Sequence, residues 1–211
     1  MKKAVIIGDS YSTFEGYIPE GYAIYYSDKE CDNTDVRRVE ETWWKRLEDK
    51  GVMHVVHNNS WSGSTICYTA YGERDCSGDS SFIFRANQLI ENGFFEKNGI
   101  DTVIIFGGTN DSWANSPLGE LKFDGIERND LFCVLPAISY LVKILREAMP
   151  SLEIICVANT EIKDEIIHAT GVAAEHYGAK YVKLCDIDKR CGHPTIKGMG
   201  EIAQQVEKAL V

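Results

Sequence analysis

An alternation of short apolar runs with longer amphipathic segments constrains the fold of this chain more than any other feature. The apolar runs lie at residues 4–7, 53–57, 102–106, 153–158 and 180–185. Runs of this length and composition predict buried strands. Segments with helical spacing lie between and after them, at residues 40–50, 81–92, 130–149, 161–177 and 195–210. Strands that alternate with helices predict parallel βαβ units joined by right-handed crossovers.

We therefore expect an α/β protein of three layers, with helices on both faces of a five-stranded parallel sheet. The strand order that we predict is the flavodoxin-like order 2-1-3-4-5. The 211 residues fit a single domain over residues 1–211. Three connections, at residues 11–39, 59–79 and 110–129, are longer than usual. Connections of that length in a compact domain are typical of binding or lid segments.

The charge balance limits the partners of the chain. There are 22 basic and 32 acidic residues, which give a net charge of −10. Such a field repels nucleic acid and anionic membranes, so we expect neither as a partner and favour a neutral small molecule. No apolar stretch approaches the roughly 20 residues of a membrane span.

The N-terminus and the cysteines add two further expectations. Only four apolar residues separate Lys3 from Gly8, too few for an export signal, so we expect a cytoplasmic protein unless a leader has been removed. The seven cysteines are dispersed and include no C-x-x-C pair, so neither a zinc site nor a redox motif is indicated. We expect no metal and no cofactor.

Ser10 follows the first apolar run directly, in the sequence Gly8-Asp9-Ser10. In open α/β sheets, ligands bind beyond the carboxyl ends of the strands. Polar segments at residues 59–64 and 107–111 follow the second and third predicted strands, and a histidine loop at 192–194 precedes the last predicted helix. We expect these four segments to converge at one edge of the sheet.

Together they hold the parts of an acyl-transfer site. Such a site needs a nucleophile, a base for its proton and donors for the oxyanion. Ser10 can be the nucleophile and His193 the base. The backbone N–H groups of Ser10 and Gly63 and the side-chain amide of Asn110 can form the oxyanion hole, where one donor typically lowers the barrier by ~3 kcal/mol.

The same segments resemble the four sequence blocks of the SGNH (GDSL-type) hydrolases, in the same order. The matching residues are Gly8-Asp9-Ser10, the glycine of Ser62-Gly63-Ser64, Gly108-Thr109-Asn110-Asp111 and Gly192-His193-Pro194. The blocks extend from residue 8 to residue 194, nearly the whole chain. The resemblance implies a single-domain α/β esterase, lipase or carbohydrate deacetylase in which Ser10, Gly63, Asn110 and His193 are the site residues.

One position departs from that pattern. The family usually places its acidic triad residue three positions before the histidine, where this chain has Arg190. The nearest acidic residues are Asp188 and Asp186. We hypothesise that the loop bulges and brings Asp188 to His193, which completes a triad. The alternative is a Ser10/His193 dyad in which a backbone carbonyl fixes the histidine tautomer.

Aromatic residues point to the substrate. We expect Trp61, Trp113 and Tyr11 to contact it, because flat rings with polar handles suit sugars. The segment after Ser10 also carries several rings, which form either a substrate platform or a small cluster under a long loop. These rings are Tyr11, Phe14, Tyr17, Tyr22, Tyr25 and Tyr26. By family analogy, the rings and the neutral-substrate argument favour O-acetyl groups on a saccharide.

The leading hypothesis is a serine hydrolase that cleaves carboxylic esters through an acyl-enzyme. Two alternatives belong to other classes. Ser10, Ser12 and Thr13 would cradle a phosphate in a flavodoxin-like binding protein. A saccharide-binding protein without turnover would follow if Arg190 marks a lost triad position. The first alternative predicts a bound flavin, and the second predicts ligand binding without hydrolysis.

Overall fold

The computed structural model describes residues 1–211 and contains the predicted parallel sheet. The five strands run parallel in the order β2-β1-β3-β4-β5, which confirms the predicted order. Their bounds are β1 Lys2–Gly8, β2 Met53–Ser60, β3 Thr102–Gly107, β4 Glu153–Ala158 and β5 Lys180–Lys183. All six residues of β3 are buried, as expected for a central strand covered on both faces.

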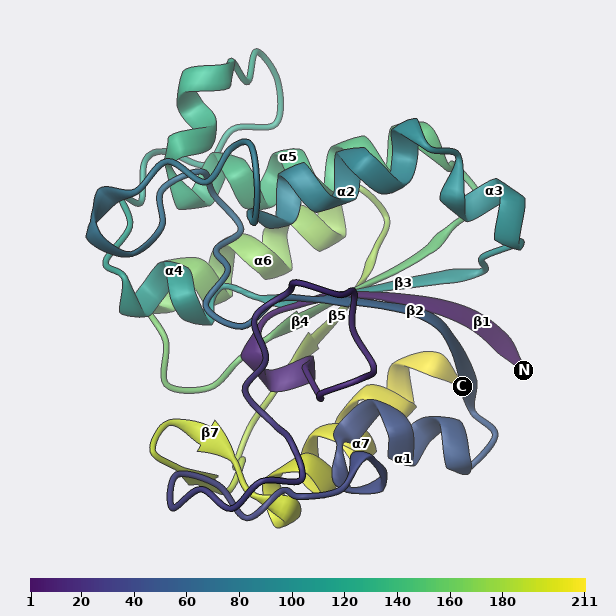
Figure 1. Cartoon of the computed structure of the whole chain (residues 1–211). Helices are drawn as coiled ribbons and strands as arrows, with labels where there is room; N and C mark the ends of the chain where they lie inside the picture. Colours follow the sequence, from purple (N-terminus) through teal and green to yellow (C-terminus); the bar gives the residue numbers. More distant parts are fainter.

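Helices cover both faces of the sheet, so the predicted three layers are confirmed (Figure 1). One layer contains α2 Phe82–Glu91, α3 Phe94–Asn98, α5 Val134–Ala148 and α6 Asp164–His176, and the other contains α1 Trp43–Asp49 and α7 Ile196–Leu210. Side chains alternate along each strand. Val5 and Val103 therefore pack in the first core, and Ile6 and Ile104 pack in the second.

The helix starts follow their sequence signals. The hydroxyls of Thr42, Ser81 and Thr195 accept backbone N–H bonds at the first turns of α1, α2 and α7. Four short 3-10 segments complete the helical structure, at Ser10–Ser12, Val39–Glu41, Tyr71–Glu73 and Arg128–Phe132. No helix is both long and apolar enough to cross a membrane.

The structure differs from the sequence prediction in several short segments. Helices α3 and α4 (Thr109–Trp113) form where we predicted connections, and β5 ends two residues early. The histidine loop is a small antiparallel hairpin of β6 (Lys189–Arg190) and β7 (His193–Pro194). Elements of two to five residues are too short to show a hydrophobic period.

The carboxyl ends of the strands meet on one side of the molecule, where α4 and β7 also lie, and both termini lie on the opposite side (Figure 1). Close packing at this edge requires glycine at two positions. A Cβ atom on Gly107 would lie 2.5 Å from the ring of Phe82, and one on Gly8 would lie 2.6 Å from the Ser60 hydroxyl. Side chains therefore pack closely against the backbone at this edge.

Candidate active site

The structure brings Ser10 and His193 into direct contact. The Ser10 hydroxyl lies 3.0 Å from His193 Nε2, although 183 residues separate the two in sequence. Ser10 begins a 3-10 turn, and the Asp9 carboxylate holds that turn by accepting the Tyr11 N–H at 3.0 Å. Ser10 is 3% exposed and His193 is 8% exposed. The pair is thus shielded from bulk water.

The surroundings of His193 fix its tautomer. Nδ1 lies 3.2 Å from the backbone carbonyl of Cys191. Because a carbonyl can only accept, Nδ1 carries the proton and the lone pair of Nε2 faces Ser10. Burial lowers the pKa of His193 to about 4; the Cys191 hydrogen bond raises this pKa and the Lys189 charge lowers it. The imidazole is therefore a neutral base at neutral pH.

The β6–β7 hairpin separates Asp188 from His193. Arg190 pairs with His193 across the hairpin, and Asp188 lies level with Thr195, whose N–H donates to the Asp188 carbonyl at 3.1 Å. The Asp188 carboxylate accepts a hydrogen bond from the Thr195 hydroxyl. The structure does not bring Asp188 to the imidazole, because the two extra residues of this loop form the hairpin turn and do not form a bulge.

That turn has an unusual backbone. Cys191 and Gly192 have φ values of 49° and 78°, and both central residues of a type I′ hairpin turn need positive φ. Gly192 is also required sterically, since a Cβ atom there would lie 2.9 Å from the ring of Trp113. The tight turn aims the Cys191 carbonyl at Nδ1.

The three predicted oxyanion donors are available. The N–H groups of Ser10 and Gly63 donate no hydrogen bond within the protein. Asn110 donates one amide hydrogen to the Ser64 carbonyl at 3.0 Å, which leaves its second amide hydrogen unused. The Tyr71 hydroxyl donates to Asn110 Oδ1 at 2.9 Å and so fixes the amide orientation.

Two buried ionisable residues hold the loops of the oxyanion side. Asp111 accepts the N–H groups of Ile66 and Cys67 at 2.9–3.0 Å. Burial raises the pKa of Asp111, and these hydrogen bonds lower it. The second residue is Arg85 on α2, which is 0% exposed.

Arg85 contacts only neutral acceptors. Its Nε donates to the Ser80 carbonyl at 3.0 Å, and Nη2 donates to the Gly8 carbonyl at 3.1 Å and the Ser64 hydroxyl at 3.0 Å. Nη1 donates to the carbonyl of Asn59. Burial lowers the pKa of Arg85 to about 10. One guanidinium thus joins the ends of β1 and β2 to the loop that contains Gly63.

The three aromatic residues predicted to bind substrate differ in exposure. Trp113 is 42% exposed and lies edge-on to His193, with ring centroids 5.5 Å apart. Trp61 is half-buried and packs on Tyr22 at 4.2 Å. Tyr11 is 0% exposed and its hydroxyl donates to the Gly192 carbonyl. Tyr11 therefore supports the histidine hairpin and has no surface for a substrate.

In the ring-rich segment after Ser10, some rings form a buried cluster under the loop and others stay accessible to a substrate. Tyr11, Phe14 and Tyr26 are buried in the core beneath the loop. Tyr17 and Tyr22 remain accessible, and Tyr25 is half-buried against His193. The segment also joins the other loops, since Ala23 accepts the Ser62 N–H at 2.9 Å.

The hydroxyls of a phosphate cradle are already occupied. Ser12 is buried and accepts the indole N–H of Trp43 at 3.1 Å. Thr13 is buried and donates to the Ser10 carbonyl at 3.1 Å. This arrangement gives no support to the flavodoxin-like binding alternative. No group of three or more His, Cys, Asp or Glu side chains is arranged to hold a metal ion.

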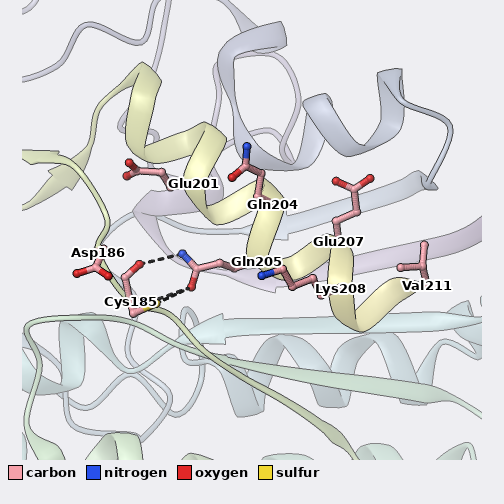
Figure 2. Close-up of a pocket in the computed structure, with 8 residues that line it drawn as sticks. All are labelled: Cys185, Asp186, Glu201, Gln204, Gln205, Glu207, Lys208 and Val211. Carbon is pink, nitrogen blue, oxygen red and sulfur yellow. Dashed lines mark hydrogen bonds between the residues drawn. The ribbon is translucent and has the colours of Figure 1, made fainter.

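A separate surface hollow lies along α7. Figure 2 shows its lining residues, among them Asp186, Glu201, Gln205 and Lys208. The side chain of Gln205 bonds the backbone of Cys185 there, with Nε2 donating to the carbonyl at 2.8 Å. None of the predicted site residues lines this hollow.

Comparison with known proteins identifies the chain as an ester hydrolase. The model of the GDSL-like lipase/acylhydrolase family matches residues 2–210. The chain therefore belongs to that family, and the resemblance found in the four blocks is confirmed.

Solved structures agree with this assignment. A candidate GDSL-like lipase from Bacteroides ovatus ATCC 8483 is 39% identical, with a TM-score of 0.90 over 100% of this chain and 98% of that one. A second, from Bacteroides uniformis ATCC 8492, is 38% identical, with a TM-score of 0.88 over 99% and 95%. An acetyl xylan esterase from Butyrivibrio proteoclasticus shares the fold at 19% identity, with a TM-score of 0.59 over 99% and 63%. A comparison with curated proteins finds no match.

Proposed function

We propose that this ester hydrolase uses Ser10 as its nucleophile and removes O-acetyl groups from saccharides. The observation that carries the proposal is the 3.0 Å contact between the Ser10 hydroxyl and His193 Nε2. The Cys191 carbonyl supports it, because it holds the imidazole in the tautomer that can accept the serine proton.

In the first half of the reaction, Ser10 Oγ attacks the ester carbonyl while His193 Nε2 takes its proton. The developing oxyanion accepts hydrogen bonds from the N–H groups of Ser10 and Gly63 and from the free amide hydrogen of Asn110. His193 then gives the proton to the departing alcohol oxygen, and the acetyl group stays on Ser10.

In the second half, a water molecule loses its proton to His193 Nε2 and attacks the acetyl-serine carbonyl. The same three donors stabilise the second oxyanion. Collapse of this intermediate releases acetate, and His193 returns the proton to Ser10. The base works as half of a dyad in this proposal, since Nδ1 is occupied by the Cys191 carbonyl and Asp188 is bonded to Thr195.

The substrate class is proposed from the rings around the pair. Trp113 is exposed beside His193, and Trp61 and Tyr22, which contact each other at an interplanar angle of 34°, flank the Gly63 loop. Flat ring faces suit the apolar faces of sugars. The acetyl xylan esterase that shares this fold adds an analogy for an acetylated saccharide.

The first test is hydrolysis of p-nitrophenyl acetate by the wild type and by Ser10→Ala. Loss of a nucleophile that works with a base removes most of the rate, so we expect kcat/KM to fall by about 10³-fold or more. Ser151→Ala, an exposed serine at the far end of the sheet, is the matched control. Wild-type turnover by Ser10→Ala would refute the proposal.

The substrate class is tested with acetylated xylo-oligosaccharides and with p-nitrophenyl esters of increasing acyl length. We expect acetate release from the oligosaccharides and a rate that falls with acyl length. Faster cleavage of long acyl chains, without acetate release from the oligosaccharides, would rule out the saccharide assignment while leaving Ser10 as the nucleophile.

A further inference from the structure

His193 is surrounded by four aromatic rings. Tyr25 lies flat on the imidazole, with ring centroids 3.5 Å apart and an interplanar angle of 10°. Trp113 and Tyr26 approach edge-on at 5.5 and 6.4 Å, and Tyr11 lies tilted at 5.4 Å. We call these four rings the aromatic box.

The other neighbours of the imidazole supply no negative charge. Ser10 contacts Nε2, and the neutral Cys191 carbonyl contacts Nδ1. The nearby charge is the cation Lys189, whose side chain is 7% exposed. Its Nζ donates to the Thr160 carbonyl at 3.0 Å and to the Glu161 carboxylate at 3.2 Å. In a triad, by contrast, a carboxylate stabilises the imidazolium that forms when the base takes the serine proton.

We propose that the aromatic box, through the face of Tyr25, stabilises the imidazolium form of His193 during the reaction in place of a triad carboxylate. The inference rests on the proposed function, in which His193 accepts the proton of Ser10. An aromatic face carries negative quadrupole charge and attracts a cation within about 6 Å of its centroid. Tyr25 acts through His193 and is therefore a positioning residue.

The fold holds Tyr25 in register with the reacting pair. The Thr13 hydroxyl donates to the Ser10 carbonyl at 3.1 Å and accepts the Tyr25 N–H at 3.0 Å. The neighbouring Tyr26 hydroxyl donates to the Pro194 carbonyl at 3.1 Å. One short segment is thus tied both to the nucleophile and to the strand that contains the base.

The sharpest test changes the ring charge and leaves the ring shape nearly unchanged. Position 25 is replaced by phenylalanine and then by mono-, di- and trifluorophenylalanine, which weaken the negative face stepwise. We expect Tyr25→Phe to stay within about twofold of the wild type, and kcat to fall about tenfold across the fluorine series with KM unchanged.

A direct readout uses methylboronic acid, which forms an anionic tetrahedral adduct with a serine hydroxyl. The adduct raises the pKa of the neighbouring imidazolium, so NMR can follow the titration of His193 in the folded protein. We expect this pKa to fall by about one unit across the fluorine series, in parallel with kcat. A ring that only fills space would leave both quantities constant.

Two controls make the outcome decisive. Tyr17 lies in the same loop as Tyr25 and packs on Phe14 and on Trp44 of α1. The same fluorine series at Tyr17 should change neither kcat nor the pKa of His193. Ser10→Ala separates the two hypotheses. Wild-type activity in that variant overturns the proposed function. Loss of activity there, together with a flat series at Tyr25, overturns the role of the aromatic box alone.

Discussion

The two halves of the site are held in place by different physical interactions. On the base side, His193 is enclosed by aromatic rings and touches one neutral carbonyl. On the oxyanion side, the loops that contain Gly63 and Asn110 are held by hydrogen bonds of the buried side chains of Arg85 and Asp111. His193, which changes charge in the proposed reaction, thus lies among polarisable rings. The loops of the oxyanion side, whose donors keep their charge, are fixed by hydrogen bonds.

This division has a physical reason. Buried polar side chains are tolerated where each donor or acceptor has a fixed partner, as at Arg85 and Asp111. His193 must be neutral in one step and charged in the next. A ring face can contact both forms without losing a hydrogen bond, whereas a second carbonyl or cation would favour only one of them.

The largest effect should come from Arg85→Met. Methionine fills part of the space but takes the Arg85 donors from the buried carbonyls of Asn59 and Ser80. The Gly8 carbonyl loses one of its two donors and keeps the Trp61 N–H at 3.1 Å. A buried acceptor left without a donor costs about 1–3 kcal/mol, so we expect the free energy of unfolding, measured by urea denaturation, to fall by about 2–6 kcal/mol.

Arg85→Lys is the matched variant, because it keeps the charge and has three donors. We expect it to lose less stability than Arg85→Met. If both variants unfolded at the wild-type urea concentration, the hydrogen bonds of Arg85 would not hold the oxyanion side.

The fall of kcat/KM at acid pH should begin only near pH 4. Burial lowers the pKa of His193 to about 4, and only the neutral imidazole can take the Ser10 proton. The rate should therefore stay constant as the pH falls from 7 to 5 and should drop about tenfold per unit well below pH 4. Initial rates on an acetate ester in buffers of constant ionic strength measure this. An acid limb near pH 6.5 would mean that water reaches the imidazole.

Tyr71→Phe should have a smaller effect that is confined to the oxyanion side. The variant removes the hydroxyl that fixes Asn110 Oδ1 and keeps the rest of the ring, which is 46% exposed. A net hydrogen bond contributes about 1 kcal/mol, which corresponds to a roughly fivefold lower kcat with little change in Tm. An unchanged kcat would show that the Ser64 carbonyl alone orients the Asn110 amide.

Asp188→Ala should have the smallest effect on catalysis. The Asp188 carboxylate bonds the Thr195 hydroxyl at the start of α7 and does not contact His193. We expect kcat/KM within about twofold of the wild type and a Tm a few degrees lower, as for a lost hydrogen bond near a helix start. A fall of 100-fold or more would restore the triad, since loss of a triad carboxylate is far more costly than this.

The sheet and the convergence of the four segments could be predicted from the sequence. Buried strands such as β3 are continuous apolar runs, and the chain direction of a parallel sheet brings their carboxyl ends together. The contact between Ser10 and His193 follows from that topology, even though the two residues are far apart in the chain.

The supporting residues could not be predicted in the same way. Arg85 bonds Gly8 across 77 residues, and Tyr71 bonds Asn110 across 39, so no local pattern marks either contact. The position of Asp188 depends on the hairpin turn at Cys191-Gly192. A glycine as the second of two turn residues is a known hairpin signal, and it favoured a tight turn over a bulge.

That turn also bears on how such sites diverge. Removing its two residues would leave Asp188 three positions before His193, which is the spacing the family usually has. Removing one residue would rotate the histidine to the opposite face of its strand, because side chains alternate along a strand. A change of two residues therefore keeps the histidine on its face of the strand, and such a step separates the proposed dyad of this chain from the triad spacing of the family.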